Sequence, residues 1–134
     1  MKILAIDPGN IQSAYCVIDA NTYKPLEFSK IKNEILELGF YNQNVYEIDK
    51  LVVEMIASYG MPVGKEVFET CVWIGRFVEI ARLKNIDVEY IYRKDEKMNI
   101  CNSMKAKDSN IRQALIDRFG PVGTKKNPRL VLWI

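Results

Sequence analysis

Short apolar runs alternate with turn-forming residues along the first third of the chain. Ile3–Ile6 is a continuous apolar run closed by Pro8-Gly9, which is typical of a buried central strand and its turn. Residues 12–18 alternate between apolar and polar side chains and predict the second strand of a hairpin. Residues 26–31 predict a third strand, and residues 33–38 predict a short helix.

The pattern then changes to the period of a long helix. Residues 51–53 predict another strand, which ends on Glu54, and a loop rich in glycine and proline follows. Residues 65–85 predict the strongest helix of the chain, with one apolar face. That face consists of Val67, Cys71, Ile74, Val78 and Ala81, and three aromatic residues lie outside it: Phe68, Trp73 and Phe77. Either packing between layers or a contact between subunits explains such a wide apolar surface.

The last third of the chain predicts one further strand and one further helix. Residues 87–92 alternate and predict the strand, whereas Asp108 or Ser109 caps a helix that runs to Phe119 and is stopped by Gly120-Pro121. The order is three strands, a strand–helix–strand unit and a helix. This order predicts one α/β domain over residues 1–134, with no repeat and no second domain.

The composition agrees with a folded domain of this size. The chain has 134 residues, of which 49% are hydrophobic and 27% charged. No apolar run approaches the roughly 18 residues that a membrane span needs, so we expect no membrane association. An odd number of cysteines, three, favours reduced thiols and a cytoplasmic protein.

The chain contains no histidine. This absence excludes nucleophiles activated by histidine and removes the commonest nitrogen ligand of metals. Three scattered cysteines make a poor zinc site. Catalysis by this chain therefore depends on carboxylates, with oxygen-ligated Mg²⁺ or Mn²⁺ as the expected cofactor.

The charges are distributed unevenly along the chain. Residues 1–92 hold 9 Lys/Arg and 13 Asp/Glu, a net charge of −4, whereas residues 93–134 hold 10 and 4, a net charge of +6. A basic last third is typical of a surface that meets phosphates. The alternative is an ordinary solvated segment of helix and loop.

Two acids share one property, since Asp7 and Glu54 each close an apolar strand and precede a break. Ligands of open α/β sheets gather beyond the carboxyl ends of strands. If the two strands are parallel neighbours, both carboxylates project into one crevice, where a divalent cation would relieve their repulsion. The alternative is that each acid only caps its strand or faces solvent.

The ordered combination of motifs resembles the RuvC-type Holliday junction resolvases of the ribonuclease H-like superfamily, and above all the compact resolvases of bacteriophages. The resemblance rests on Ile6-Asp7-Pro8-Gly9 before a hairpin, Val52-Val53-Glu54 before a loop and long helix, Gly64–Phe68, and Lys105–Leu115. The first motif alone is weak, because kinases and ATPases of the actin-like fold also open with Asp-x-Gly.

This resemblance implies a ribonuclease H-like mixed sheet flanked by helices and a homodimer that cleaves four-way DNA junctions with Mg²⁺ or Mn²⁺. It implies that Asp7 bridges two metal ions and that Glu54 holds one of them, in the cytoplasm of a bacterial or phage-infected cell. Tyr59 and Phe68 would stack on bases at the junction centre. For both aromatics the alternative is packing within the protein.

Six basic residues are candidates for contacts with DNA phosphates, without reading sequence: Arg93, Lys94, Lys97, Lys105, Lys107 and Arg112.

The chain departs from the family at its C-terminus. Such resolvases complete the metal site with aspartates on a helix that follows a stretch like residues 123–128, whereas this chain continues with Arg129 and the apolar residues 130–134. We therefore expect a truncation or changed reading frame after Pro128. Three acids are candidates for the missing ligand: Asp95, Asp108 and Asp117. For Asp108, a role as the cap of the following helix is the better explanation.

Three functions stay open from the sequence. The first is a structure-selective nuclease, and the second is a junction-binding protein of the same fold whose catalysis is impaired. The third, a fragment of an actin-like ATPase or kinase, is weakest because 134 residues do not supply a second domain to close over a nucleotide.

Overall fold

The computed structural model describes residues 1–42, 47–124 and 126. It contains five strands: β1 (Lys2–Asp7), β2 (Gln12–Asp19), β3 (Pro25–Lys32), β4 (Lys50–Glu54) and β5 (Asp87–Ile91). The described residues also form four helices: α1 (Asn33–Tyr41), α2 (Lys65–Leu83), α3 (Arg93–Cys101) and α4 (Asp108–Phe119). The expected elements are thus present within a few residues of their predicted bounds, apart from α3, which the sequence pattern did not predict.

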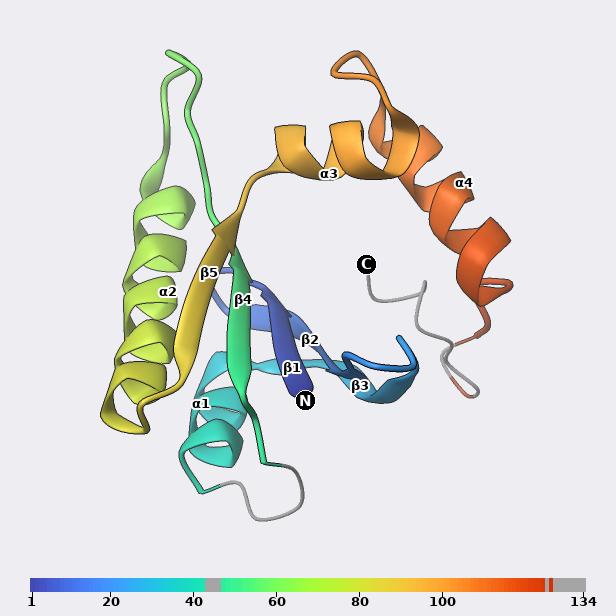
Figure 1. Cartoon of the computed structure of the whole chain (residues 1–134). Coiled ribbons are helices and arrows are strands. Elements are labelled where there is room, and N and C mark those ends of the chain that lie inside the picture. Colours follow the sequence, from blue (N-terminus) through green and yellow to red (C-terminus); the bar gives the residue numbers. More distant parts are fainter. Residues whose placement is uncertain (43–46, 125, 127–134) are drawn as a thin grey trace.

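The five strands form one mixed sheet in the order β3-β2-β1-β4-β5 (Figure 1). The first three strands are an antiparallel meander, whereas β4 runs parallel to both β1 and β5. The turn after Asp7 makes the hairpin, and the crossover through α2 makes β4 and β5 parallel. The predicted α/β class with a mixed sheet is confirmed.

The hydrophobic core lies between one face of the sheet and the helices α1 and α2, which cover that face together (Figure 1). Alternate residues of the strands point into it, and Leu51 and Val53 are completely buried. Phe77 of α2 is completely buried against them. Burying each such side chain contributes about 1.5–3 kcal/mol. Most of the buried apolar side chains of the described residues belong to this core, so it makes the main contribution to stability.

The position of Phe77 corrects the prediction that it lies outside the main face of the long helix. The buried residues of α2 are Thr70, Ile74, Phe77, Ile80 and Ala81. The apolar arc of this helix is wide, so periodicity alone did not tell which part of it faces the sheet. Three apolar side chains of α2 are exposed: Phe68 at 62%, Val72 at 63% and Leu83, the last residue of the helix, at 60%.

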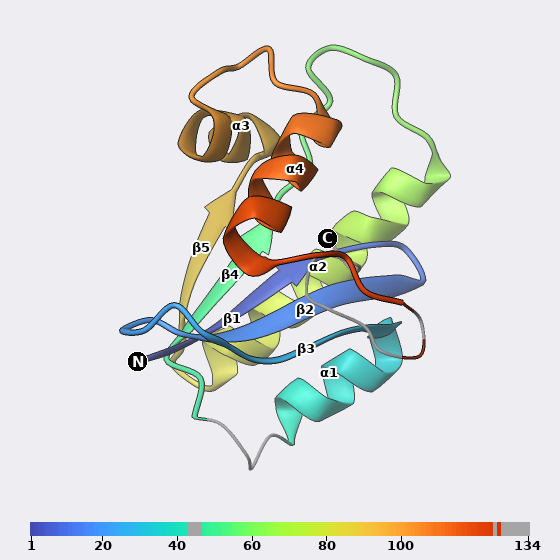
Figure 2. The ribbon, with the colours of Figure 1, turned by 90° about the vertical axis from the view of Figure 1, so that its right-hand side faces the viewer.

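Helices α3 and α4 lie on the other side of the sheet, beyond the carboxyl ends of its parallel strands, and α4 passes over that face (Figures 1 and 2). The sequence of α3 is mostly charged and polar and has no buried residue, so no apolar period revealed it. Its start is fixed by Asp95, whose Oδ2 accepts a hydrogen bond from the Tyr92 amide at 3.1 Å.

The prediction that Asp108 or Ser109 caps the last helix is wrong. Asp108 is the first residue of α4, and Lys107 occupies the cap position. The Lys107 amide donates a hydrogen bond of 2.8 Å to Oδ1 of Asn110, so the asparagine supplies the oxygen that holds this end.

The described residues also test the expectations about cysteines and membrane spans. Cys16, Cys71 and Cys101 are all free, in agreement with the expected thiols. Burial raises the pKa of the Cys16 thiol to about 11, which keeps that thiol protonated and unreactive. Among the helices of the described residues, none combines the length and apolarity required to span a bilayer.

A buried polar network fixes the turn that follows Asp7. The Gly9 amide donates to Ser13 Oγ at 3.1 Å, the Ser13 hydroxyl donates to Asn33 Oδ1 at 2.5 Å, and Asn33 Nδ2 donates to the Gly9 carbonyl at 2.8 Å. Ser13 and Asn33 are only 1% and 0% exposed. A Cβ at Gly9 would lie 2.2 Å from the backbone oxygen of Gln12, so only glycine fits there.

We predict that Asn33→Ala lowers the free energy of unfolding by about 2–4 kcal/mol, because it leaves the Ser13 hydroxyl and the Gly9 carbonyl buried without their partner. Urea unfolding followed by circular dichroism measures this loss. Asn99→Ala, at an exposed asparagine of α3, is the matched control and should change stability by less than about 0.5 kcal/mol. Equal effects of the two variants would contradict the network.

Candidate active site

Asp7 and Glu54 lie side by side at the carboxyl edge of the sheet. β1 and β4 are parallel neighbours whose last registered pair is Ile6 with Val53, and each acid is the next residue of its strand. Because Ile6 and Val53 point into the core, the two acids point to the opposite face. The condition on which the sequence prediction depended, that the strands are parallel neighbours, is fulfilled.

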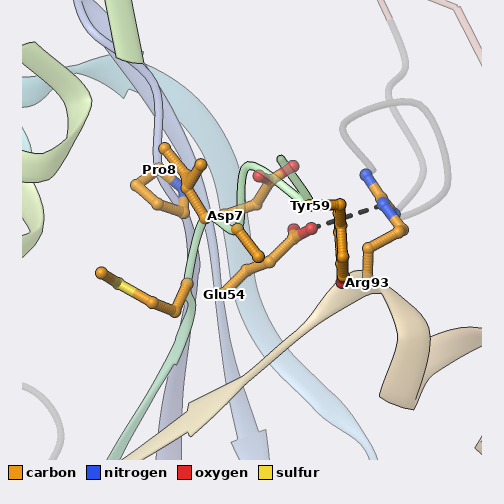
Figure 3. Close-up of a pocket in the computed structure, with 8 residues that line it drawn as sticks. Asp7, Pro8, Glu54, Tyr59 and Arg93 are labelled. Carbon is orange, nitrogen blue, oxygen red and sulfur yellow. Dashed lines mark ion pairs between the residues drawn. The ribbon is translucent and has the colours of Figure 1, made fainter. Parts of the chain in front are cut away.

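The two carboxylates open into a pocket of about 210 Å³. Its walls come from the ends of β1 and β4, from the loop after β4 and from the start of α3: Asp7, Pro8, Glu54, Met55, Ile56, Ala57, Tyr59 and Arg93. Figure 3 shows Asp7 and Glu54 facing one space, with Arg93 reaching Glu54. The Met55 amide donates to the Ile91 carbonyl at 2.7 Å, which continues the β4–β5 ladder past Glu54 and holds its backbone.

The environment of Glu54 disfavours its charged form. The pKa of this carboxyl is raised to about 7, mainly by burial, then by the negative charges of Glu96 and Asp7 and by a side-chain hydrogen bond to Asp7. Its side chain is 18% exposed, whereas Asp7 is exposed. A perturbed carboxylate beside a second one in a cleft is a candidate functional site.

Arg93 lies within this acidic group. Its Nε is 3.4 Å from Glu54 Oε1, its Nη1 is 2.8 Å from Glu96 Oε2, and its Nε is 3.9 Å from Asp108 Oδ1. Burial lowers the pKa of Arg93, but the surrounding carboxylates, led by Glu54, raise it by more. The guanidinium predicted to contact DNA is thus engaged by carboxylates of the site.

Glu96 is the residue of this site that the sequence analysis missed. Its side chain is 18% exposed, and burial raises its pKa against the opposing charge of Arg93. Had the sequence predicted a helix that begins at Arg93, Glu96 would have been a candidate, because residues three apart lie on the same face of a helix. The other acids considered lie elsewhere: Asp95 caps α3, and Asp117 accepts a hydrogen bond from Gln113 on α4.

The sequence matches no known family model, and no curated protein is significantly similar to it. Two solved structures are similar in fold. Thermus thermophilus RuvC in complex with a Holliday junction substrate has a TM-score of 0.73 at 15% identity, over 99% of this chain and 88% of that one. The Thermus thermophilus RuvC structure has a TM-score of 0.74 at 14% identity, over 99% and 89%. The chain has the RuvC fold. The expected ribonuclease H-like architecture is therefore confirmed.

The two aromatic candidates are both exposed in this RuvC fold. Tyr59 is 65% exposed and lines the pocket beside the two acids. Phe68 is 62% exposed and is not part of the pocket wall, since it lies in the first turn of α2. The alternative that they pack within the protein is contradicted for both side chains.

The remaining basic candidates lie on or between α3 and α4. Lys94 and Lys97 belong to α3, Lys105 and Lys107 to the connection after it, and Arg112 to α4. Lys94, Lys105, Lys107 and Arg112 are exposed and Lys97 is half-buried. Unlike Arg93, none of them lines the pocket of Asp7 and Glu54.

The donor set of the pocket fits a hard divalent cation. Asp7 and Glu54 offer carboxylate oxygens, and Mg²⁺ accepts one or two carboxylates together with waters and phosphate oxygens. Glu96 and Asp7 both act electrostatically on Glu54. Even so, no group of three acids, cysteines or histidines in metal-binding geometry occurs among the described residues. Asp7 and Glu54 are therefore the candidate ligands, and Glu96 is a nearby charge that does not complete a group of three ligands.

We predict that the stability of the metal-free protein falls as the pH rises from about 4.5 to about 7. Below about 4.5 Glu54 is protonated in both states, whereas between the two values only the unfolded chain releases the proton. A shift of this size corresponds to roughly 3 kcal/mol. Urea unfolding with a chelator, at about pH 5 and about pH 8, should show Glu54→Gln gaining stability relative to wild type at the higher pH.

The control for this prediction is Glu47→Gln, at an exposed glutamate before β4. It should follow the wild-type dependence on pH. A constant difference between wild type and Glu54→Gln at both pH values would show that Glu54 titrates normally in the folded chain.

Proposed function

We propose that this protein is a metal-dependent, structure-selective endonuclease that resolves four-way DNA junctions. The observation that supports this most is the pair Asp7 and Glu54, adjacent at the carboxyl edge of parallel strands in a chain with the RuvC fold. One of the solved structures similar in fold is a RuvC in complex with a Holliday junction substrate.

The two carboxylates have different tasks in this proposal. Asp7 is exposed, so it would hold a metal ion at the open side of the site, where the cleaved phosphate would meet that ion. Glu54 is recessed in the pocket, with its side chain 18% exposed, and would supply a second carboxylate ligand to such an ion. A bound Mg²⁺ or Mn²⁺ supplies Lewis-acid stabilisation of the phosphate and a water of lowered pKa. Because Glu54 must be ionised to ligate, loading is favoured as the pH rises through about 7.

The DNA in this proposal approaches the edge that carries the acids. The loop before α2 and the connection between α3 and α4 both extend past that edge (Figure 2). The first carries Tyr59 for stacking on an unpaired base, and the second carries Lys105 and Lys107 for phosphates. Lys94, Lys97 and Arg112 extend the positive charge along α3 and α4, which favours recognition of DNA shape over sequence.

A homodimer would bring two such sites to one junction. A four-way junction has two-fold symmetry and requires two cuts, which an isologous dimer supplies. Phe68 and Val72 are exposed one turn apart on α2, so they present an apolar surface that a second α2 would cover.

A protein that binds junctions without cutting them is the second candidate. It is favoured by the absence, among the described residues, of a third acid in metal-binding geometry with Asp7 and Glu54. The predicted loss of a ligand after Pro128 lies outside the described residues. A site with only two carboxylates would bind Mg²⁺ more weakly than a fuller ligand set, and stabilisation of the transition state would drop with the loss of the ion.

We predict that Asp7→Asn lowers the rate of cleavage of a synthetic four-way junction by at least about a hundredfold, with Mg²⁺ or Mn²⁺. Junction binding should be retained or become tighter, because the variant removes a negative charge that repels phosphates. Single-turnover cleavage and gel-shift titrations measure the two effects. The double variant Lys105→Glu, Lys107→Glu is the contrast, since it should weaken binding to every sequence and flatten the salt dependence.

The outcomes separate the two candidate functions. Cutting by Asp7→Asn at the wild-type rate would show that the site is assigned wrongly. Specific binding of the junction by the wild-type chain, without cleavage in either metal, would favour the second candidate.

We predict that the wild-type protein is a dimer at tens of micromolar and that Phe68→Ser with Val72→Ser makes it a monomer. Two exposed apolar side chains on one helical face are replaced by polar ones, which removes the driving force for burying that face. Light scattering gives the mass. Ile11→Ser changes an apolar residue of similar exposure, 64%, in the turn between β1 and β2 and should leave the dimer intact. A wild-type monomer would contradict the proposed interface.

A further inference from the structure

We infer that Arg93 acts as an internal counter-ion of the metal site: its guanidinium pairs with Glu54 before a divalent cation arrives and weakens the binding of that cation by competing with it. This inference rests on the proposed function, because it takes Asp7 and Glu54 as the ligands. It assigns Arg93 a role other than the contact with DNA that the basic sequence suggested.

The position of Arg93 in the fold supports this role. It is the first residue of α3, and only Tyr92 separates it from β5, the strand that pairs with β4. Its side chain therefore reaches Glu54 at the end of β4 (Figure 3). The guanidinium lies within 4 Å of carboxylates from three elements, Glu54 of β4, Glu96 of α3 and Asp108 of α4. Arg93 is thus shared among three carboxylates and does not form a simple surface ion pair with one of them.

Exposure shows which partner is able to move. The side chain of Arg93 is 41% exposed, whereas those of Glu54 and Glu96 are 18% exposed. The guanidinium can therefore turn away from Glu54 into solvent at little cost, while the carboxylates keep their places in the site. The contact of 3.4 Å with Glu54 is also longer than the hydrogen bond of 2.8 Å with Glu96, so Glu96 can retain the arginine as Glu54 is released.

Charge determines the direction of the effect on metal binding. Four carboxyl groups, Asp7, Glu54, Glu96 and Asp108, act electrostatically on one arginine. A divalent ion at Glu54 is repelled by the guanidinium a few ångströms away and competes with it for the same oxygen. Removal of the positive charge should therefore tighten binding of the cation, roughly three- to tenfold at physiological ionic strength.

The inference is tested by Mn²⁺ binding to the full chain without DNA, measured by calorimetry and by the electron spin resonance of free Mn²⁺. Arg93→Met should tighten Mn²⁺ binding roughly three- to tenfold, and Arg93→Lys, which keeps the charge, should stay within about twofold of wild type. Lys94→Met is the matched control. It removes the same charge from the next residue, which forms none of the ion pairs found among the described residues, and should change binding by less than about twofold.

Arg93→Gln repeats the test with a polar neutral side chain and replaces Arg93→Met if that variant does not fold. Binding by the neutral variant that is no tighter than binding by Lys94→Met overturns the inference. A weaker affinity overturns it as well, because it would mean that Arg93 orders the ligands rather than competing with the ion.

Asp7→Asn distinguishes failure of this inference from failure of the proposed function. If Asp7→Asn weakens Mn²⁺ binding and the neutral Arg93 variant does not tighten it, the role of Arg93 is wrong and the metal site stands. If Asp7→Asn has no effect, or if neither wild type nor the neutral Arg93 variant binds Mn²⁺, the metal site and the inference both fail.

Discussion

The crowding of negative charge at the ends of β1 and β4 is the constraint around which this site is built. Two parallel strands in register place Asp7 and Glu54 next to each other, and burial raises the pKa of Glu54 to about 7. Such a pair is unfavourable unless a proton or a cation compensates the charge. In the described protein the guanidinium of Arg93 pairs with Glu54, and the raised pKa of Glu54 favours uptake of a proton by this carboxyl group.

The rest of the fold keeps these two carboxyl groups in place. On one face, the core formed with α1 and α2 holds β1 and β4 as the buried centre of the sheet. The network of Gly9, Ser13 and Asn33 fixes the turn directly after Asp7, with buried polar groups that each have a partner. The stability of the apolar face is thus what permits two carboxylates to stay together at its edge.

The RuvC fold and the local chemistry support the proposal in different ways. The fold is similar to that of RuvC over 99% of the chain at 15% identity, which concerns architecture. The carboxylate pair, the exposed aromatic beside it and the basic connection after α3 belong to this chain and carry the functional argument. Arg93 belongs both to the fold and to the site. As a residue of α3, it forms ion pairs with Glu54 at the end of β4 and with Asp108 of α4.

The sequence by itself determined the strands, the long helix and the two acids at strand ends, because short-range periodicity and turn residues report local structure directly. It did not reveal α3, whose polar residues have no apolar period, or the burial of Phe77 within a wide apolar arc. Only the tertiary structure decided that Arg93 faces carboxylates and that Glu96 joins the site. Both contacts depend on the direction in which α3 leaves β5, and a one-dimensional pattern of polarity carries no information about that direction.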